Sequence, residues 1–445
     1  MNLFSSLTKN QRESIGLLQI GTFLEYFDLM LYVHMAVFLN ELFFPKTDPH
    51  TAALLSAFAF CSTFVLRPFG ALIFGYLGDH IGRKSTVIIT TMLMSLSSIV
   101  MANLPTYAQI GITAAWIMTI CRMVQGVASL GEIVGAEVYL TETIEKPARY
   151  PIVALITVAS VAGTVMALII ASAFTSFKMD WRIVFWIGSG IAAVGSIART
   201  RLRETPEFAD MKRRIKEITS IEDKIEALKA KKIIRSTILS GHKSHYQKSA
   251  FFFFLLQCSW PICFYFSYVY CGNILKSLGC TAEQVIHQNL AVTLVQLASL
   301  CFVSYLSYQV HPLKILKVKA LFFLIFLMLM PFWLMHAQST LQVFLIQALS
   351  VSLAMDSTPG IPVFLEHLPI LKRYTYASLT YAFSRAGMYI VTSFGLIYLT
   401  DWFGAWGLWV VFIPATIGFL MSVRHFEKLE FNHTKTSFVK LRTAA

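Results

Sequence analysis

The sequence predicts an all-α membrane protein with twelve transmembrane helices in two six-helix lobes. The first observation is composition: the 445 residues are 56% hydrophobic and only 14% charged, with a mean hydropathy of +0.63, whereas soluble domains carry about 25% charged residues. The second is a series of apolar segments, each close to the ~20 residues that cross a ~30 Å hydrocarbon layer. The third is one long polar interruption, from Arg199 to Lys248, which leaves six apolar segments on each side.

The twelve segments define the expected domains. Those before the interruption lie near residues 15–40, 51–77, 85–103, 110–140, 151–176 and 183–200; those after it lie near 249–274, 285–308, 315–336, 341–366, 376–399 and 404–424. The first is too long for a signal-peptide core, so we expect it to stay as an uncleaved anchor. The predicted organisation is an N-terminal lobe at 1–200, a linker at 201–248, a C-terminal lobe at 249–425 and a short tail at 426–445.

Basic residues predict the orientation in the membrane. Only seven of the 37 Lys and Arg residues fall in outward loops or inside the membrane, namely Lys46, Lys178, Arg182 and Lys276, and Arg67, Arg122 and Arg385. Because the others lie on one side of an even number of crossings, both termini are expected to be cytoplasmic. The net charge of +13 follows from this bias and from attraction to anionic lipid, so no nucleic-acid partner is expected.

The linker and the cysteines each leave two interpretations open. Apolar residues recur in the linker at helical spacing opposite lysines, namely Ile218, Ile221, Ile225 and Leu228 opposite Lys224, Lys229 and Lys231. This pattern predicts an amphipathic helix on the inner membrane surface, either as a solvated connector or as a site for a regulatory partner. The seven cysteines form no C-x2-C pair and are typical of small core residues. Cys271 and Cys280 could nevertheless pair outside the membrane.

A short polar link between the second and third apolar segments, Gly75-Tyr-Leu-Gly-Asp79-His-Ile-Gly82-Arg83-Lys84, combines glycines with charges. Gly75 and Gly82 let two helices turn tightly and approach closely. Asp79, Arg83 and Lys84 are expected in water at the membrane surface, where they could clamp neighbouring helix ends. We therefore predict that this loop acts in gating.

The first apolar segment holds Glu25, Asp28 and Tyr32 on one helical face. Ionisable groups within a bilayer are costly and mark pathways or relays. The two carboxylates could share or pass a proton, which makes them candidates for proton coupling, while Tyr32 is a candidate substrate contact. The alternative is a structural pair between one acid and an arginine of a neighbouring helix.

The fourth segment carries a polar stripe of Arg122, Gln125, Ser129 and Glu132, at spacings of three, four and three. Such a stripe must face protein or water. Arg122, with Gln125, is the candidate to bind a substrate carboxylate, because a guanidinium offers a planar, permanently charged fork. Glu132 could neutralise it in the empty site and take part in proton coupling. Alternatively, Arg122 and Glu132 lock the two lobes together.

Three further charges complete the candidate substrate site. Arg67, before Pro68, is expected to form an ion pair with the first-segment acids. Asp356 precedes Pro359 and Pro362, which break the helix and free carbonyls to line a cavity. Asp356 and Arg385 are expected to pair across neighbouring helices. Aromatic residues of the seventh segment, Trp260, Tyr265, Tyr268 and Tyr270, either pack in the core or form a cage for a quaternary ammonium group.

These features together resemble the metabolite:proton symporter branch of the major facilitator superfamily, including its proline/glycine betaine transporters. The matching residues run through most of the chain: Gly21 with Glu25-Tyr-Phe-Asp28 and Tyr32, Phe43-Phe-Pro45, Arg67-Pro68 through Lys84, Leu104-Pro-Thr-Tyr107, Arg122 with Gln125-Gly126 and Gly131-Glu132, Trp181-Arg182, Glu204-Thr-Pro-Glu-Phe208, and Arg373-Tyr-Thr375. The resemblance implies twelve helices, alternating access and uptake of a small organic solute driven by protons.

The chain also departs from that pattern. Leu130 stands where a glycine is expected before Gly131, Tyr376 replaces a glycine, and Ala382 replaces an asparagine. The second copy of the signature loop, around Tyr308 to Lys314, lacks its acidic residue and its glycine. Gating and substrate choice in the second lobe are therefore where this chain is expected to differ.

The expected function is proton-coupled import of a small zwitterion, such as proline or betaine, or of a small carboxylate. The alternatives are a metabolite or drug efflux antiporter and a non-transporting membrane sensor on the same fold. No P-loop, metal-ligand cluster or nucleophile elbow is evident in the sequence, so the chain is not expected to be an enzyme. We expect no cofactor beyond the coupling proton, no partner beyond the solute and the lipid bilayer, a monomer, and a multi-pass location in a bacterial inner membrane.

Overall fold

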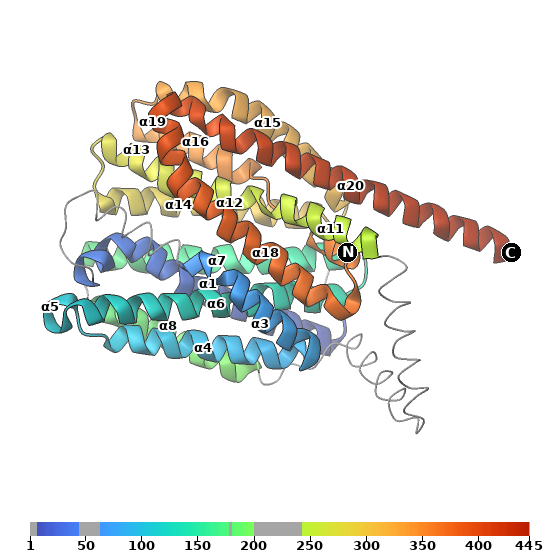
Figure 1. Ribbon diagram of the computed structural model, residues 1–445, viewed down its shortest axis with the longest axis horizontal. Coiled ribbons are helices and arrows are strands. Elements are labelled where there is room, and N and C mark those ends of the chain that lie inside the picture. Colours follow the sequence, from blue (N-terminus) through green and yellow to red (C-terminus); the bar gives the residue numbers. More distant parts are fainter. Residues whose placement is uncertain (1–6, 44–62, 178–179, 200–242, 445) are drawn as a thin grey trace.

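The described part of the chain is mainly helical. The computed structural model describes residues 7–43, 63–177, 180–199 and 243–444, and every regular element in these ranges is helical. The first half of the chain supplies α1 (Lys9–Phe43), α3 (Arg67–His80), α4 (Arg83–Asn103), α5 (Tyr107–Ile110), α6 (Ile112–Thr143), α7 (Arg149–Phe177) and α8 (Trp181–Arg199). In Figure 1 these blue-to-green helices form one bundle.

The second half forms a second bundle beside the first, drawn in yellow to red (Figure 1). Its elements are α11 (Lys243–Gln257), α12 (Ser259–Phe264), η1 (Tyr265–Tyr270), α13 (Cys271–Ser277), α14 (Ala282–Leu306), α15 (Pro312–Met335), α16 (Thr340–Leu353), α17 (Ile361–Glu366), η2 (Ile370–Lys372), α18 (Arg373–Ile390), η3 (Val391–Gly395), α19 (Leu396–Phe403), η4 (Gly404–Trp406) and α20 (Gly407–Ala444). We call the two bundles the first and second lobes. The predicted linker helix at 218–228 lies outside the described residues, so the domain boundaries stay a prediction.

The described helices have the length and composition of a membrane protein. Six of them are long and apolar enough to cross a bilayer: Ile112–Thr143, Arg149–Phe174, Tyr246–Ser277, Glu283–Leu306, Pro312–Met335 and Gly404–Phe431. Large apolar side chains also face outward, among them Trp116 (62% exposed) and Phe302 (65% exposed). Such exposure is unfavourable in water and neutral in hydrocarbon, so these faces are suited to lipid.

Glycines set the closest helix contacts within the first lobe. A Cβ atom on Gly163 of α7 would lie 2.2 Å from the carbonyl oxygen of Phe23 in α1, and one on Gly126 of α6 would lie 2.1 Å from that of Thr63. No side chain fits at either point. The helices can therefore approach at backbone distance, as small residues allow in membrane bundles.

Both described ends of the chain lie at the same end of the molecule (Figure 1), which we call the terminal end. There the start of α1 meets the end of α6, because Gln11 donates a hydrogen bond to the carbonyl of Thr143 (2.9 Å). The opposite end carries the α13–α14 turn, where Gly279 has a φ of 89° and Thr281 and Gln284 form a capping box at the start of α14.

The tenth apolar segment is interrupted as predicted. Helix α16 ends at Leu353 and α17 begins at Ile361, so residues 354–360 are not helical. The prolines at 359 and 362 explain the break, since proline cannot continue the backbone hydrogen bonds of the preceding turn. The seventh and eleventh segments instead stay continuous through the π-helical turns η1 and η3. Cys271 and Cys280 are both free thiols, so the structure holds no disulfide between them.

Candidate functional site: a charged cavity between the lobes

A cavity of about 90 Å³ lies at the interface of the two lobes. Its walls come from α1, α3, α6 and α7 in the first lobe, and from α11, α12, η1, α14, the α16–α17 connection, α17 and α18 in the second. Much of the wall is aromatic, contributed by Tyr26, Phe64, Trp260, Phe264, Tyr268, Tyr381 and Tyr389. Trp260 and Tyr268 are two of the four seventh-segment aromatics singled out from the sequence.

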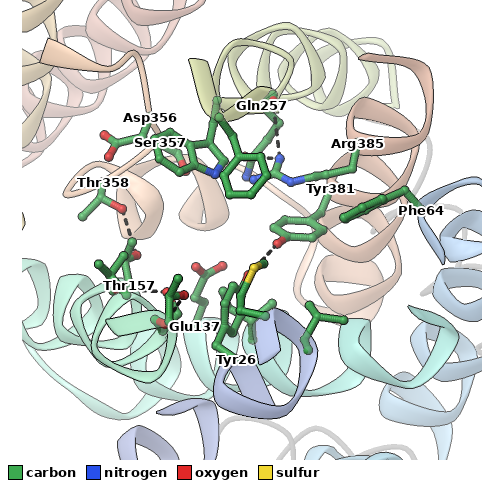
Figure 2. A pocket seen from close by; sticks show the side chains of 18 of the residues that line it. Tyr26, Phe64, Glu137, Thr157, Gln257, Asp356, Ser357, Thr358, Tyr381 and Arg385 are labelled. Carbon is green, nitrogen blue, oxygen red and sulfur yellow. Dashed lines mark hydrogen bonds between the residues drawn. The ribbon is translucent and has the colours of Figure 1, made fainter. Parts of the chain in front are cut away.

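Four ionisable side chains of opposite sign border this cavity: Arg67, Glu137, Asp356 and Arg385. Arg67, Asp356 and Arg385 were predicted as substrate contacts from the sequence. Figure 2 shows Glu137 and Tyr26 on the first-lobe side of the space and Arg385 and Gln257 on the second-lobe side. The site therefore offers both cationic and anionic groups in an aromatic setting.

Arg385 is held firmly by its own lobe. Its Nη1 donates to the carbonyl (3.1 Å) and to Oε1 (2.9 Å) of Gln257, and to Oγ of Ser384 (3.2 Å). Its guanidinium also lies 3.7 Å from the centroid of the Tyr381 ring, a favourable cation–π geometry. These contacts fix the orientation of the guanidinium at the cavity wall.

The prediction that Asp356 pairs with Arg385 is wrong. Asp356 instead accepts a hydrogen bond from Nζ of Lys319 on α15, at 3.2 Å, and both side chains are nearly buried. The long lysine stem reaches the helix break from the neighbouring helix, while Gln257 already satisfies Arg385. The sequence reasoning missed Lys319 because it stands among other lysines near a predicted helix end.

Arg67 also differs from its expected pairing. Its guanidinium lies 4.4 Å from the centroid of the Phe64 ring, and among the described residues no ion pair joins it to an acid of α1. Because α3 starts at Arg67 with Pro68 in its first turn, the side chain lies beside the cavity rather than within the acid cluster of α1. Arg67 stays a candidate substrate contact.

A second polar centre lies inside the first lobe, where α1, α4 and α6 meet. Oδ2 of Asp28 accepts hydrogen bonds from Oγ of Ser98 (2.6 Å) and from Nε2 of Gln125 (2.8 Å). Oε1 of Gln125 in turn accepts from Nη1 of Arg122 (2.8 Å), and the Arg122 guanidinium lies 4.0 Å from the centroid of the Tyr32 ring. We call this set the Asp28 network.

The Asp28 network collects four of the predicted site residues at one place. Asp28 and Arg122 are 1% and 3% exposed in their lobe, and Gln125 bridges them. Arg122, Gln125 and Tyr32 do not belong to the lining of the interlobe cavity, so their predicted substrate contact stays a prediction. Leu29 and Met30, which directly follow Asp28, do line the cavity. The network therefore stands immediately behind the first-lobe wall.

The other two acids predicted to take part in proton coupling are Glu25 and Glu132. Glu25 is buried, at 5% exposure, one turn before Asp28 on α1, and no described hydrogen bond joins it to the Asp28 network. The side chain of Glu132 lies outside the described residues. Their roles in proton coupling stay predictions.

The signature loop joins α3 to α4, and its glycines have the predicted geometry. Gly82 precedes α4 with a φ of 124°, a conformation that favours glycine. A Cβ atom on Gly75 would lie 3.1 Å from Cα of Thr375 in α18 of the second lobe, so Gly75 lies at the contact between lobes. The side chains of Asp79, Arg83 and Lys84 lie outside the described residues, and their gating role stays a prediction.

Ion pairs join the lobes at the terminal end. Glu366, at the end of α17, pairs with Lys146 (2.8 Å), which lies in the turn before α7. It also pairs with Arg149, the first residue of α7. Burial alone would lower the pKa of Lys146, but its hydrogen bond to Glu366 and the charge of Glu366 raise it above its usual value. Arg373 of α18 pairs with Glu142 of α6 at 3.0 Å. We call these three ion pairs the terminal latch.

Further contacts cross between the lobes along the cavity and beyond it. The hydroxyl groups of Tyr26 and Tyr381 are 3.0 Å apart, and those of Thr157 and Thr358 are 2.9 Å apart. Towards the opposite end, Ser176 donates to Oε1 of Glu283 (2.6 Å). All of these are polar contacts, which can break and reform as the lobes move.

Glu137 is the cavity residue that the sequence reasoning overlooked. It is an acid within the apolar fourth segment, which is itself a signal of function. Glu137 lies off the helix face that carries the polar stripe of Arg122, Gln125, Ser129 and Glu132, so the stripe did not indicate it. The structure shows that this other face of α6 borders the cavity.

Comparison with known proteins shows the family. Residues 18–369 match the Major Facilitator Superfamily, so the chain belongs to this superfamily of membrane transporters. The fold is also that of solved members: the proton:xylose symporter XylE bound to 6-bromo-6-deoxy-D-glucose has a TM-score of 0.75 at 16% identity, covering 92% of this chain and 94% of that one. FucP in the outward conformation gives a TM-score of 0.66 at 14% identity, covering 94% and 99%.

Sequence relatives point to one branch. Proline/betaine transporters of Salmonella typhimurium and Escherichia coli are each 32% identical over 204 residues, which is 44% of this chain and 41% of the relative. The aligned region thus spans less than half the length of these relatives. The resemblance to proline/glycine betaine transporters drawn from the motifs is confirmed, and because the superfamily consists of transporters, so is the prediction that the chain is not an enzyme.

Proposed function

We propose that the protein is a proton-coupled symporter that imports a small organic solute by alternating access. The solute is a zwitterion, such as proline or betaine, or a small carboxylate. The observation that carries this proposal is the interlobe cavity, bordered by Arg67, Glu137 and Arg385 with the Asp28 network directly behind its first-lobe wall. The names of the related transporters and of the structurally similar symporter support it.

The Asp28 network is the proposed proton site. A carboxylate held by two donors and close to a guanidinium can exist charged, and on protonation it would release Gln125 and Arg122 from their present contacts. Such a change would reach the cavity through Leu29 and Met30, which follow Asp28 on α1. Solute binding and protonation could thereby be coupled. No cofactor other than the proton is needed in this scheme.

Alternating access would use the contacts between the lobes. The terminal latch and the Tyr26–Tyr381 and Thr157–Thr358 contacts hold the lobes together on the terminal side of the cavity and around it. Opening towards that side requires these contacts to break, which polar pairs can do at moderate cost. We further propose twelve crossings, cytoplasmic termini, a monomeric state and a bacterial inner-membrane location.

Uptake by proteoliposomes tests this function. Purified protein is reconstituted and given labelled proline, betaine, α-ketoglutarate or shikimate, with and without an inward proton gradient. The proposal expects accumulation of one of the zwitterions or carboxylates only when the gradient is present. Solute loss from loaded vesicles driven by an opposite proton flow would instead establish an efflux antiporter. Absence of any gradient-dependent flux, in protein that binds solute, would favour a sensor.

A further inference from the structure

Glu137 is a carboxylate in an unusual position. It is 5% exposed, on the face of α6 that borders the cavity, and Figure 2 shows its carboxylate directed into that space. Within the part of the chain that the structure describes, no hydrogen bond or ion pair reaches this carboxylate. Burial without a direct partner is unfavourable for the charged form of a carboxyl group, and a cation bound beside Glu137 would stabilise that form.

A positively charged side chain, Arg385, lies across the cavity from Glu137. Arg385 attracts Glu137 electrostatically, yet the two residues belong to different lobes and form no ion pair in the described structure. Every hydrogen bond of Arg385 to a described residue comes from Nη1, which leaves Nη2 available to a ligand. The cavity therefore presents a carboxylate and a guanidinium that face one space without neutralising each other directly.

The walls between these two charges suit an organic cation. Tyr381 lies beside Arg385 and Tyr26 lies beside Glu137 (Figure 2), and Trp260 also lines the cavity. Aromatic faces attract ammonium groups, and quaternary ammonium groups in particular. The remaining acid of the cavity, Asp356, is already paired with Lys319, so Glu137 is the acid best placed to receive a cation.

We propose that Glu137 is the cation-recognising group of the transport site and that the site selects zwitterions. The ammonium group of the solute would lie against Glu137 and the neighbouring rings, while its carboxylate would accept hydrogen bonds from Arg385. A solute bound in this way bridges the two lobes. The inference rests on the proposed transport function and makes it narrower, because it favours a zwitterion over a simple carboxylate.

Two ligands of the same shape isolate the contribution of the cation. Glycine betaine and 3,3-dimethylbutyrate share size and carboxylate, but the latter carries a neutral carbon in place of the charged nitrogen. Direct binding of each is measured by calorimetry on purified wild type, Glu137→Gln and Glu137→Asp. The control is Glu145→Gln, which removes an exposed acid in the turn after the same helix.

Wild type is expected to bind betaine more tightly than its neutral analogue. Glu137→Gln should weaken betaine by about tenfold or more, the effect of losing one charge-assisted contact, and leave binding of 3,3-dimethylbutyrate unchanged or tighter. Glu137→Asp should keep the preference for betaine, and the Glu145 control should match wild type. The Asp variant thus separates loss of charge from loss of folding.

Three outcomes would overturn the inference: equal binding of both ligands by wild type, binding by neither, or an equal loss of both in Glu137→Gln. An equal loss of both ligands would mean that Glu137 carries a proton or stabilises the fold instead of recognising the cation. These outcomes are distinct from failure of the proposed function, which is read from gradient-driven uptake. A protein can bind betaine through Glu137 and still show no proton-coupled accumulation.

Discussion

The two lobes hold their buried charges in different ways. In the first lobe, Asp28, Gln125 and Arg122 form a chain of hydrogen bonds that closes within three packed helices. In the second lobe, Arg385 and Asp356 line the cavity, and Lys319 pairs with Asp356. The first lobe closes this set of charges within itself and, of its described charged residues, presents only Arg67 and Glu137 to the cavity, whereas the buried charges described in the second lobe centre on Arg385 and Asp356, which both line it.

The helices of the two lobes also differ in how regular their backbones are. Helices α1, α6 and α7 of the first lobe run unbroken past the cavity, and glycines bring α1 and α7 into backbone contact. The second lobe contains the π-helical turns η1 and η3 and the break between α16 and α17. Irregular turns within helices often occur at functional sites. The first lobe, which holds the proposed proton site, is thus the more regular of the two, and the irregular second lobe is the one that we expect to adapt to the solute.

The largest effect is expected in the first lobe. Asp28→Asn should abolish accumulation driven by a proton gradient and leave exchange of solute across the membrane, because a neutral amide imitates the protonated acid. Gradient-driven uptake and counterflow in proteoliposomes measure the two activities. Glu13→Gln, which alters an exposed acid of the same helix, is the control and should behave as wild type. If Asp28→Asn accumulates solute normally, the proton site lies outside the Asp28 network.

A smaller effect is expected from the buried pair of the second lobe. Lys319→Met alone should lower the free energy of unfolding by roughly 2–4 kcal/mol, somewhat less than for a fully buried pair, because Asp356 borders the cavity and water screens it there. Adding Asp356→Asn should restore much of the loss, since no unpaired charge then remains. Unfolding in mixed micelles measures both. Lys317→Met, which removes an exposed pairing with Glu427, is the control, and equal destabilisation by it would contradict the assignment.

The smallest effect is expected where the lobes meet. Glu366→Gln removes the acid shared by Lys146 and Arg149, and these two partly exposed ion pairs together are expected to contribute about 1 kcal/mol. The population open at the terminal end should therefore rise by about fivefold. Distances between spin labels at 145 and 372, one on each lobe, measure this shift. Glu427→Gln breaks an ion pair within one lobe and should leave the distances unchanged. An unchanged distribution in Glu366→Gln would show that the latch does not set the conformation.

Much of the fold could be predicted from the sequence. The break in the tenth segment followed from two prolines, and the tight turn at Gly82 followed from the signature loop, because both depend on local backbone chemistry. Residues of one helix face, such as Arg122 and Gln125, were grouped correctly for the same reason. The joining of Asp28 to Gln125 required the packing of α1 against α6, which no local pattern contains.

The sequence by itself determined that the chain is a helical membrane protein of two halves, because a bilayer admits only long apolar helices and leaves a strong imprint on composition. It also determined which charges are unusual, since few ionisable groups enter such helices. Only the tertiary structure decided how they are arranged: Asp356 pairs with Lys319 rather than Arg385, and Glu137 faces Arg385 across the cavity. These contacts depend on how helices far apart in the chain are rotated and shifted relative to one another. The packing of whole side-chain surfaces sets that rotation and shift.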